Sequence, residues 1–307
     1  MTDAGATAVL ADEVRTLARE RDALILAHNY QRAEVQDVAH IVGDSLELAR
    51  RAAAAEASVI VLAGVRFMAE TAKILAPAKT VLLPRTDAGC PMADMITAEA
   101  LAAWKAGNPG VPVVMYVNSS AEVKALTDVC CTSANAVEVV RSLGAPKVLF
   151  GPDRNLGAWI GSQLPDVEMA LWDGYCPVHD EVTLEMVTAA REAEPGALVL
   201  AHPECRPEVT ADADAVLSTS QMLRYAAASD AEAFIVVTEA GLITGLERAA
   251  PGKRFVGLAP AMMCPNMKLT RLDHVRDALR DMAGEVVVPA DVADAARGSL
   301  ERMTAIG

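Results

Sequence analysis

Three of the six cysteines in this chain of 307 residues stand directly before a proline, at nearly equal intervals. They are Cys90, Cys176 and Cys264, which lie 86 and 88 residues apart. Thiolate sulfur is a favoured ligand of zinc and of iron–sulfur clusters. A single free cysteine is usually a small buried apolar residue, but three in the same local setting predict one shared metal centre.

A centre held by three cysteines has a chemical consequence. A cluster of four irons that only carries electrons normally has four cysteine ligands, so three thiolates leave one iron open to act as a Lewis acid. The other cysteines, Cys130, Cys131 and Cys205, do not recur at equivalent positions. Among them Cys205 is the strongest competing ligand, because it directly follows the polar segment His202-Pro-Glu204.

Scarce titratable residues gather in polar segments that end the apolar stretches of the chain. There are four tyrosines and five histidines in all, and three of each lie in such segments: Tyr30, Tyr116, Tyr175, His28, His179 and His202. Phenol and imidazole groups, together with a carboxylate such as Glu204, supply the acids and bases of proton transfer. The pattern predicts a site for acid and base chemistry and not a packing role.

A hydroxyl-bearing residue lies 17 positions after the polar end of each of three apolar stretches. The ends are His28, Tyr116 and His202, and the hydroxyl residues are Ser45, Ser133 and Thr219, the last preceded by Ser218. Such residues favour helix N-caps, and helix N-termini bind anions. We expect both roles, which would let an acidic protein hold phosphate or carboxylate groups without a basic patch.

The elements that must position these residues repeat three times. Short Val-, Ile- and Leu-rich segments alternate with helical stretches, which is typical of an α/β fold with parallel sheets covered on both faces. The interval from polar strand end to cysteine is 62, 60 and 62 residues in the three copies. Each copy is predicted to contain three strands and to end in its Cys-Pro loop.

The repeat predicts three αβα units of three layers each, related by a pseudo-threefold axis. They cover residues 1–95, 96–180 and 181–270, and residues 271–307 form an extension that packs back on the first unit. Ligands of parallel sheets bind at the edge formed by the carboxyl ends of the strands. Three such edges turned inward would enclose a central active site and bring the three cysteines together.

Composition restricts the partners. With 27 basic and 41 acidic residues the net charge is −14, so nucleic acid and anionic membranes are poor candidates. The N-terminus lacks the features of a signal peptide, and no apolar segment is long enough to cross a bilayer. We therefore expect a soluble cytoplasmic protein, in which reduced cysteines serve metal binding or catalysis and not disulfides.

In combination, these motifs resemble those of the quinolinate synthase family over nearly the whole chain. The resemblance is carried by His28-Asn-Tyr-Gln, Gly43-Asp-Ser45, Tyr116-Val-Asn118-Ser, Thr132-Ser-Ala-Asn135, Asp173-Gly-Tyr-Cys176, His202-Pro-Glu204-Cys and Cys264-Pro-Asn-Met-Lys268. It implies a transferase of de novo NAD biosynthesis that condenses iminoaspartate with dihydroxyacetone phosphate to quinolinate, phosphate and water. It also implies a 4Fe–4S cluster held by the three cysteines, with one open iron that assists dehydration.

The resemblance further implies roles for individual residues. The anionic groups of the substrates would be bound by His28, Ser45, Ser133, Ser218 and Thr219, and the intermediate would be positioned by Asn118. Protons would be moved by Tyr30, Tyr116, His202 and Glu204. An aspartate oxidase or an aspartate dehydrogenase would supply the imine.

Three other interpretations fit part of the sequence. One is a different hydro-lyase that uses an open cluster iron on a hydroxy di- or tricarboxylate. Another is an iron–sulfur sensor or electron carrier, which would need a fourth protein ligand and no pocket of titratable residues. The third is a scaffold stabilised by zinc, which metal analysis distinguishes from the others.

Overall fold

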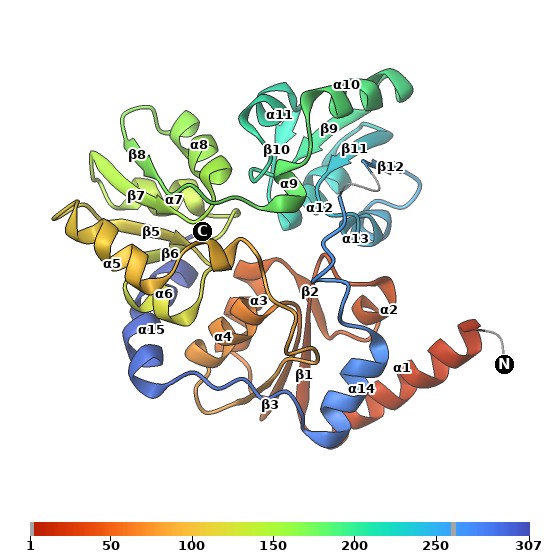
Figure 1. The fold of residues 1–307 in the computed structure, drawn as a ribbon. Helices are drawn as coiled ribbons and strands as arrows, with labels where there is room; N and C mark the ends of the chain where they lie inside the picture. The colour runs from red at the N-terminus through yellow and green to blue at the C-terminus, as the bar shows by residue number, and fades with distance from the viewer. Residues whose placement is uncertain (1–2, 259–261) are drawn as a thin grey trace.

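The computed structural model describes residues 3–258 and 262–307 of the chain. Within them the chain forms three four-stranded sheets in succession, and the neighbouring strands of each sheet are parallel. Helices flank each sheet, which gives three αβα units (Figure 1). The predicted fold class is confirmed.

The first unit has the strand order β2-β1-β3-β4. Its strands are β1 (Ala23–His28), β2 (Ile41–Gly43), β3 (Val59–Ala63) and β4 (Thr80–Leu82). Its helices are α1 (Asp3–Glu20), α2 (Ala33–Gln36), α3 (Ser45–Ala53) and α4 (Arg66–Leu75). All five residues of β3 are buried, as expected for a parallel strand covered by helices on both faces.

The second unit has the equivalent order β6-β5-β7-β8. Its strands are β5 (Val113–Tyr116), β6 (Val129–Cys131), β7 (Lys147–Gly151) and β8 (Glu168–Leu171). The short 3-10 helix η1 (Ala93–Met95) leads into this unit, whose helices are α5 (Ala98–Ala106), α6 (Ala121–Ala125), α7 (Ala136–Ser142), α8 (Arg154–Gln163) and α9 (Pro177–Asp180). The shared strand order supports the repeat inferred from the motif spacing.

The third unit has the order β10-β9-β11-β12. Its strands are β9 (Leu198–Ala201), β10 (Ala215–Val216), β11 (Ala233–Val237) and β12 (Arg254–Gly257). Its helices are α10 (Leu184–Ala193), α11 (Pro207–Asp212), α12 (Thr219–Ala228) and α13 (Leu242–Ala249).

The prediction of three strands per unit was wrong by one. The additional strands are β2, β6 and β10, which have only two or three residues each. Each pairs with the first strand of its unit. Segments this short cannot show a hydrophobic period, so the sequence pattern does not reveal them. Each leads the chain into one of the hydroxyl turns.

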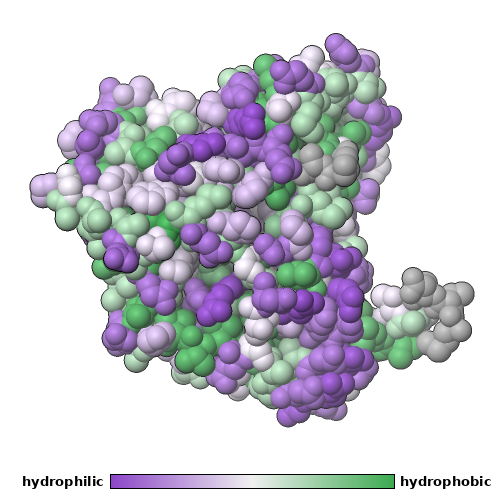
Figure 2. Space-filling view, in the orientation of Figure 1, coloured by the Kyte–Doolittle hydropathy of each residue, from purple (hydrophilic) through white to green (hydrophobic). Residues whose placement is uncertain are grey.

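The C-terminal extension joins two units. Helix α14 (Leu272–Asp281) packs on α1 and β3 of the first unit and buries Leu272, Val275 and Leu279, while hydrophilic side chains cover its outer face (Figure 2). Helix α15 (Ala290–Ala305) packs against α6 and β6 of the second unit and against α4 of the first. The unit boundaries near residues 95, 180 and 270 stay predictions.

The three units surround a common centre, seen in the middle of Figure 1. Because all strands of a sheet are parallel, their carboxyl ends lie at one edge, where ligands of such sheets bind. The loops that follow β1, β5 and β9 carry the polar motifs found in the sequence. No helix in the described part of the chain is both long enough and apolar enough to cross a membrane.

Candidate active site

A cavity of about 160 Å³ lies where the three units meet, and residues from each unit line it. Twelve of the predicted site residues contribute to its wall: His28, Tyr30, Ser45, Cys90, Tyr116, Asn118, Ser133, Cys176, His202, Glu204, Thr219 and Cys264. Ser218 is the one predicted residue outside this lining, although the structure describes it. Residues far apart in the sequence therefore converge on one site.

The cysteines of the three Cys-Pro loops all face this cavity. Burial, with a smaller contribution from Cys264, raises the pKa of Cys90 to about 12. Burial likewise raises the pKa of Cys176, with Glu204 and Cys90 adding to the effect. Such thiols do not ionise readily by themselves, but a bound metal centre offsets the negative charge and deprotonates its thiol ligands. This donor set therefore fits a metal–sulfur centre.

The remaining cysteines lie in the hydrophobic cores. Cys130 and Cys131 belong to β6 and are fully buried among apolar side chains. Cys205, the strongest competing ligand in the sequence, is buried in the core of the third unit with its Sγ 3.5 Å from the Val237 carbonyl oxygen. None of the three is among the described residues that line the cavity.

Buried carboxylates hold two of the three cysteine loops. The Asp153 Oδ2 atom accepts the Cys176 N–H at 3.0 Å, and Glu239 Oε1 accepts the Cys264 N–H at 3.1 Å. Glu239 also forms an ion pair with Lys268 at 2.9 Å. Both carboxylates follow the third strand of their unit, and neither was among the predicted site residues.

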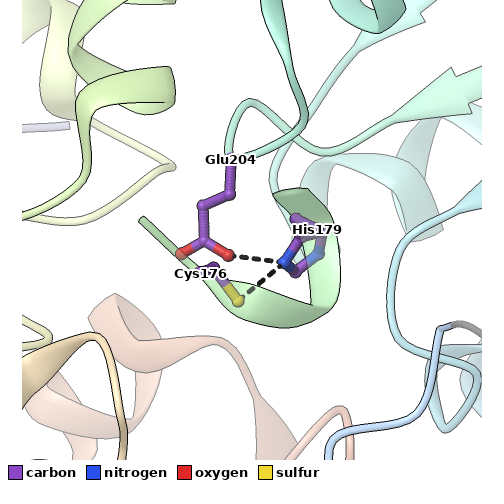
Figure 3. A group of neighbouring side chains, drawn as sticks. All are labelled: Cys176, His179 and Glu204. Carbon is purple, nitrogen blue, oxygen red and sulfur yellow. Dashed lines mark hydrogen bonds and ion pairs between the residues drawn. The ribbon is translucent and has the colours of Figure 1, made fainter. Parts of the chain in front are cut away.

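His179 connects the cysteine loop of the second unit to Glu204 (Figure 3). Its Nδ1 atom lies 2.8 Å from Glu204 Oε2 and 3.2 Å from Cys176 Sγ. The three ligand atoms lie within 4.8 Å of one another, so this group also fits a single metal ion. His179 was singled out as a scarce residue in the sequence but was not among the predicted site residues.

A chain of hydrogen bonds continues from His179 to the first unit. His179 Nε2 lies 2.9 Å from Thr238 Oγ1, which lies 2.6 Å from the Tyr30 hydroxyl. Burial raises the pKa of Tyr30 well above its usual range, so the phenol is protonated and can donate. The path then runs from Tyr30 through Thr238 and His179 to Glu204. Thr238 is fully buried and was not predicted as a site residue.

Glu204 is the anionic end of this path. Burial by itself would raise the pKa of Glu204, but neighbouring His202 and His179, together with hydrogen bonds from His179 and Tyr116, hold that pKa below its usual range. Glu204 is therefore ionised near pH 7.

The two other histidines of the cavity are neutral near pH 7. Burial lowers the pKa of His28 to about 4 and that of His202 to about 3. His28 Nδ1 accepts the Tyr30 N–H at 3.1 Å, so in the neutral ring Nε2 carries the proton. His202 Nε2 lies 3.2 Å from the Ser133 hydroxyl. These rings serve as neutral hydrogen-bonding groups and not as cations.

The hydroxyl turns differ in which residue caps the start of the helix that follows. The predicted N-cap role is wrong at Ser45, because Asp44 caps α3 by accepting the Glu47 N–H at 2.9 Å. It is also wrong at Ser133, because the N-cap of α7 is the residue two positions later. Ser218 does cap α12, which explains why its hydroxyl is not in the cavity wall. The hydroxyl residues that do line the cavity are Ser45, Ser133 and Thr219.

Among the described residues, no lysine or arginine lines the cavity. The Asn118 side-chain oxygen is buried in this wall and has no hydrogen-bond partner within the described part of the chain. The cavity lining combines neutral donors and acceptors and the N-termini of α3 and α12 with the carboxylates of Asp44, Glu204 and Glu239. Such a site suits a small molecule with several polar groups.

Comparison with known proteins agrees with this geometry. The sequence profile described as "Quinolinate synthetase A protein" matches residues 12–305. The quinolinate synthase of Geobacter metallireducens is 54% identical over 96% of this chain and 96% of its own length. Those of Methanoregula boonei and Clostridium kluyveri are 51% and 50% identical, over 98% and 97% of this chain and 99% and 98% of their own lengths. With half of its residues identical to these enzymes along almost its full length, the chain belongs to the quinolinate synthase family.

Proposed function

We propose that this protein condenses iminoaspartate with dihydroxyacetone phosphate to give quinolinate, phosphate and water in de novo NAD biosynthesis. The observation that carries the proposal is the convergence of three cysteine loops and a set of acid and base side chains on one cavity. Ring formation from these substrates requires both repeated proton transfers and the loss of water.

Cys90, Cys176 and Cys264 are the proposed ligands of a 4Fe–4S cluster. The donor set supports this, because the three thiols face one cavity and the other cysteines lie in the cores. When bound, the cluster supplies a Lewis-acidic iron that assists dehydration. The Cys176, His179 and Glu204 group is the alternative for a zinc ion, so metal analysis is part of the test.

The anionic groups of the substrates are held by neutral donors in this proposal. Ser45 and Thr219 begin α3 and α12, where backbone N–H groups and the helix dipole favour negative charge. Ser133 and the Nε2–H of His28 supply further hydrogen bonds to the same cavity. Ser218 supports this set indirectly, because its capping interaction fixes the start of α12.

The path from Tyr30 to Glu204 carries the proposed proton transfers. Tyr30 lines the cavity, so its hydroxyl can give a proton to a bound molecule, and Thr238 and His179 can replace that proton. Glu204 accepts hydrogen bonds from His179 and Tyr116 and can take up a proton in return. His202 lies between Ser133 and Glu204 and can orient both the substrate and the carboxylate.

The source of the imine and the location of the enzyme follow from this function as predictions. Iminoaspartate would come from an aspartate oxidase or an aspartate dehydrogenase. The reaction would take place in the cytoplasm, where the cysteines stay reduced.

The function is tested by anaerobic iron and sulfide analysis together with product detection. Wild-type protein should contain about four irons and four sulfides per chain and form quinolinate from enzymatically generated iminoaspartate and dihydroxyacetone phosphate. Replacement of Cys90, Cys176 or Cys264 by serine should remove the cluster and the activity. Cys205→Ser is the matched control and should retain both. Zinc in place of iron, or cluster loss in the control, would refute the ligand assignment.

A further inference from the structure

Lys124 is a buried cation that is not among the described residues lining the cavity. It belongs to α6, and none of its surface is exposed. It forms no ion pair with any described carboxylate, unlike Lys268, which pairs with Glu239. An ammonium group without a paired carboxylate in the protein interior is costly, and burial lowers its pKa accordingly.

The ammonium group instead holds the segment that carries Asn118. Lys124 Nζ donates a hydrogen bond to the carbonyl oxygen of Ser119. Ser119 is itself fully buried, and its hydroxyl donates to the Tyr116 carbonyl at 3.1 Å. These two hydrogen bonds fix the backbone at Ser119, the residue next to Asn118.

Lys124 also lies directly behind the cavity wall. Its Nζ is 5.6 Å from the ring centroid of Phe67, and Phe67 lines the cavity. A cation at this distance from an aromatic face is attracted by the ring. On the far side of α6, Ser299 of α15 donates to the Lys124 backbone carbonyl at 3.1 Å. The lysine is therefore held between the C-terminal helix and the site.

The group positioned in this way is a hydrogen-bond acceptor that lacks a partner. Asn118 Oδ1 is buried in the cavity wall and forms no hydrogen bond within the described protein. An unpaired buried acceptor costs free energy unless a ligand supplies a donor. The substrates of the proposed reaction carry such donors, an imine N–H and hydroxyl groups.

We propose that Lys124 is a positioning residue, whose hydrogen bond to the Ser119 carbonyl aims the Asn118 side-chain oxygen at an N–H or O–H group of the bound substrate. This inference rests on the proposed function. Lys124 touches no reacting atom in this role, so its effect must pass through Asn118.

A double-mutant cycle tests the coupling. Lys124→Met removes the ammonium and keeps most of the packing, and it should lower kcat/KM for quinolinate formation by about tenfold to a hundredfold, as expected for a misplaced substrate contact. In an Asn118→Ala background the same change should lower kcat/KM less than about twofold, because the contact that it positions is already absent. Iron content should match wild type in every variant.

Lys253→Met is the matched control. Lys253 also donates to backbone carbonyls and lies 5.7 Å from a phenylalanine ring, that of Phe234. Unlike Phe67, Phe234 is not among the described residues that line the cavity. Its replacement should leave kcat/KM within about twofold of wild type in both backgrounds. Lys124→Gln shortens the side chain but keeps an N–H donor, and should recover part of the activity lost in Lys124→Met.

The outcomes separate the two proposals. A wild-type protein that forms no quinolinate would refute the function, whatever the variants do. Equal losses from Lys124→Met in both backgrounds, or a parallel loss of iron, would overturn the positioning role while the function stands. Failure of both Lys124 variants to fold, judged by circular dichroism, would also overturn it, because the lysine would then serve stability alone.

Discussion

Replacing Thr238 by valine interrupts the path from Tyr30 to Glu204 at its centre with almost no change in shape. The hydroxyl makes two close contacts, at 2.6 Å to Tyr30 and 2.9 Å to His179. Both partners are buried, so valine leaves two polar atoms without a partner. At about 1–2 kcal/mol for each, the free energy of unfolding should fall by about 2–4 kcal/mol.

The effect on catalysis should be larger in kcat than in KM. Thr238 is not among the described residues that line the cavity, so the variant should bind substrate normally. Tyr30 can still give its proton, but the path that replaces this proton is broken. Loss of a positioned acid or base group costs about a hundredfold or more, and kcat should fall by that factor while iron content stays at the wild-type level.

The assay is steady-state quinolinate formation under anaerobic conditions, with urea unfolding measured on the same preparations. Thr127→Val is the matched control, because Thr127 is buried and donates one hydrogen bond to the Val123 carbonyl at 2.9 Å. It should cost about 1 kcal/mol of stability and leave kcat unchanged. Tyr30→Phe combined with Thr238→Val should be no slower than the slower single variant. A Thr238→Val enzyme with kcat within threefold of wild type would show that protons do not use this path.

Three further predictions concern other parts of the molecule. Gly174→Ala places a Cβ atom 2.5 Å from a backbone oxygen beside the second cysteine loop, so the variant should lose most of its bound iron in iron analysis. In Gly89→Ala the new Cβ atom meets no atom within 4 Å, so this control should retain its iron. Arg50→Met removes hydrogen bonds to three carbonyl groups of the C-terminal segment and should lower the free energy of unfolding by about 1–3 kcal/mol. Its control is Arg51→Met, which changes an exposed neighbour and should lower the free energy of unfolding by less than about 0.5 kcal/mol. Burial lowers the pKa of His28 to about 4, below its unfolded value near 6.5, so its contribution is present above pH 6.5 and is lost as the pH falls toward 4. Between pH 7 and pH 5 the wild type should therefore lose about 2 kcal/mol more stability than His28→Gln in urea titrations.

The sequence predicted the residues that end the strands better than the contacts those residues make. Strand ends, hydroxyl turns and Cys-Pro loops follow from local pattern, and parallel strands bring them to one edge. The contact between Tyr30 and Thr238 joins residues 208 positions apart in the sequence. A local sequence pattern cannot predict a contact of that separation, so Thr238 was not among the predicted site residues.

The capping residues show a second limit of sequence pattern. A serine or threonine in a polar turn predicts an N-cap, but Asp44 and Asn135 stand close to Ser45 and Ser133 and take those positions. Which of several neighbouring polar residues caps a helix depends on where the helix begins, and that depends on tertiary packing. The error matters for function, because a hydroxyl that does not cap is free to face the cavity.

A threefold scaffold explains how one cavity can combine polar groups of different kinds. Equivalent positions at the strand ends carry His28, Tyr116 and His202, which are neutral because burial lowers the imidazole pKa values and raises that of the phenol. Glu204 belongs to the third unit, and it accepts hydrogen bonds from His179 and Tyr116 of the second unit. Repetition of the backbone places three sets of side chains around one centre, and divergence at matching positions gives each set a different chemistry. His202→Tyr introduces the residue found at the equivalent position of the second unit, Tyr116. It should preserve the fold, because the backbone is repeated, but it removes the imidazole that lies between Ser133 and Glu204.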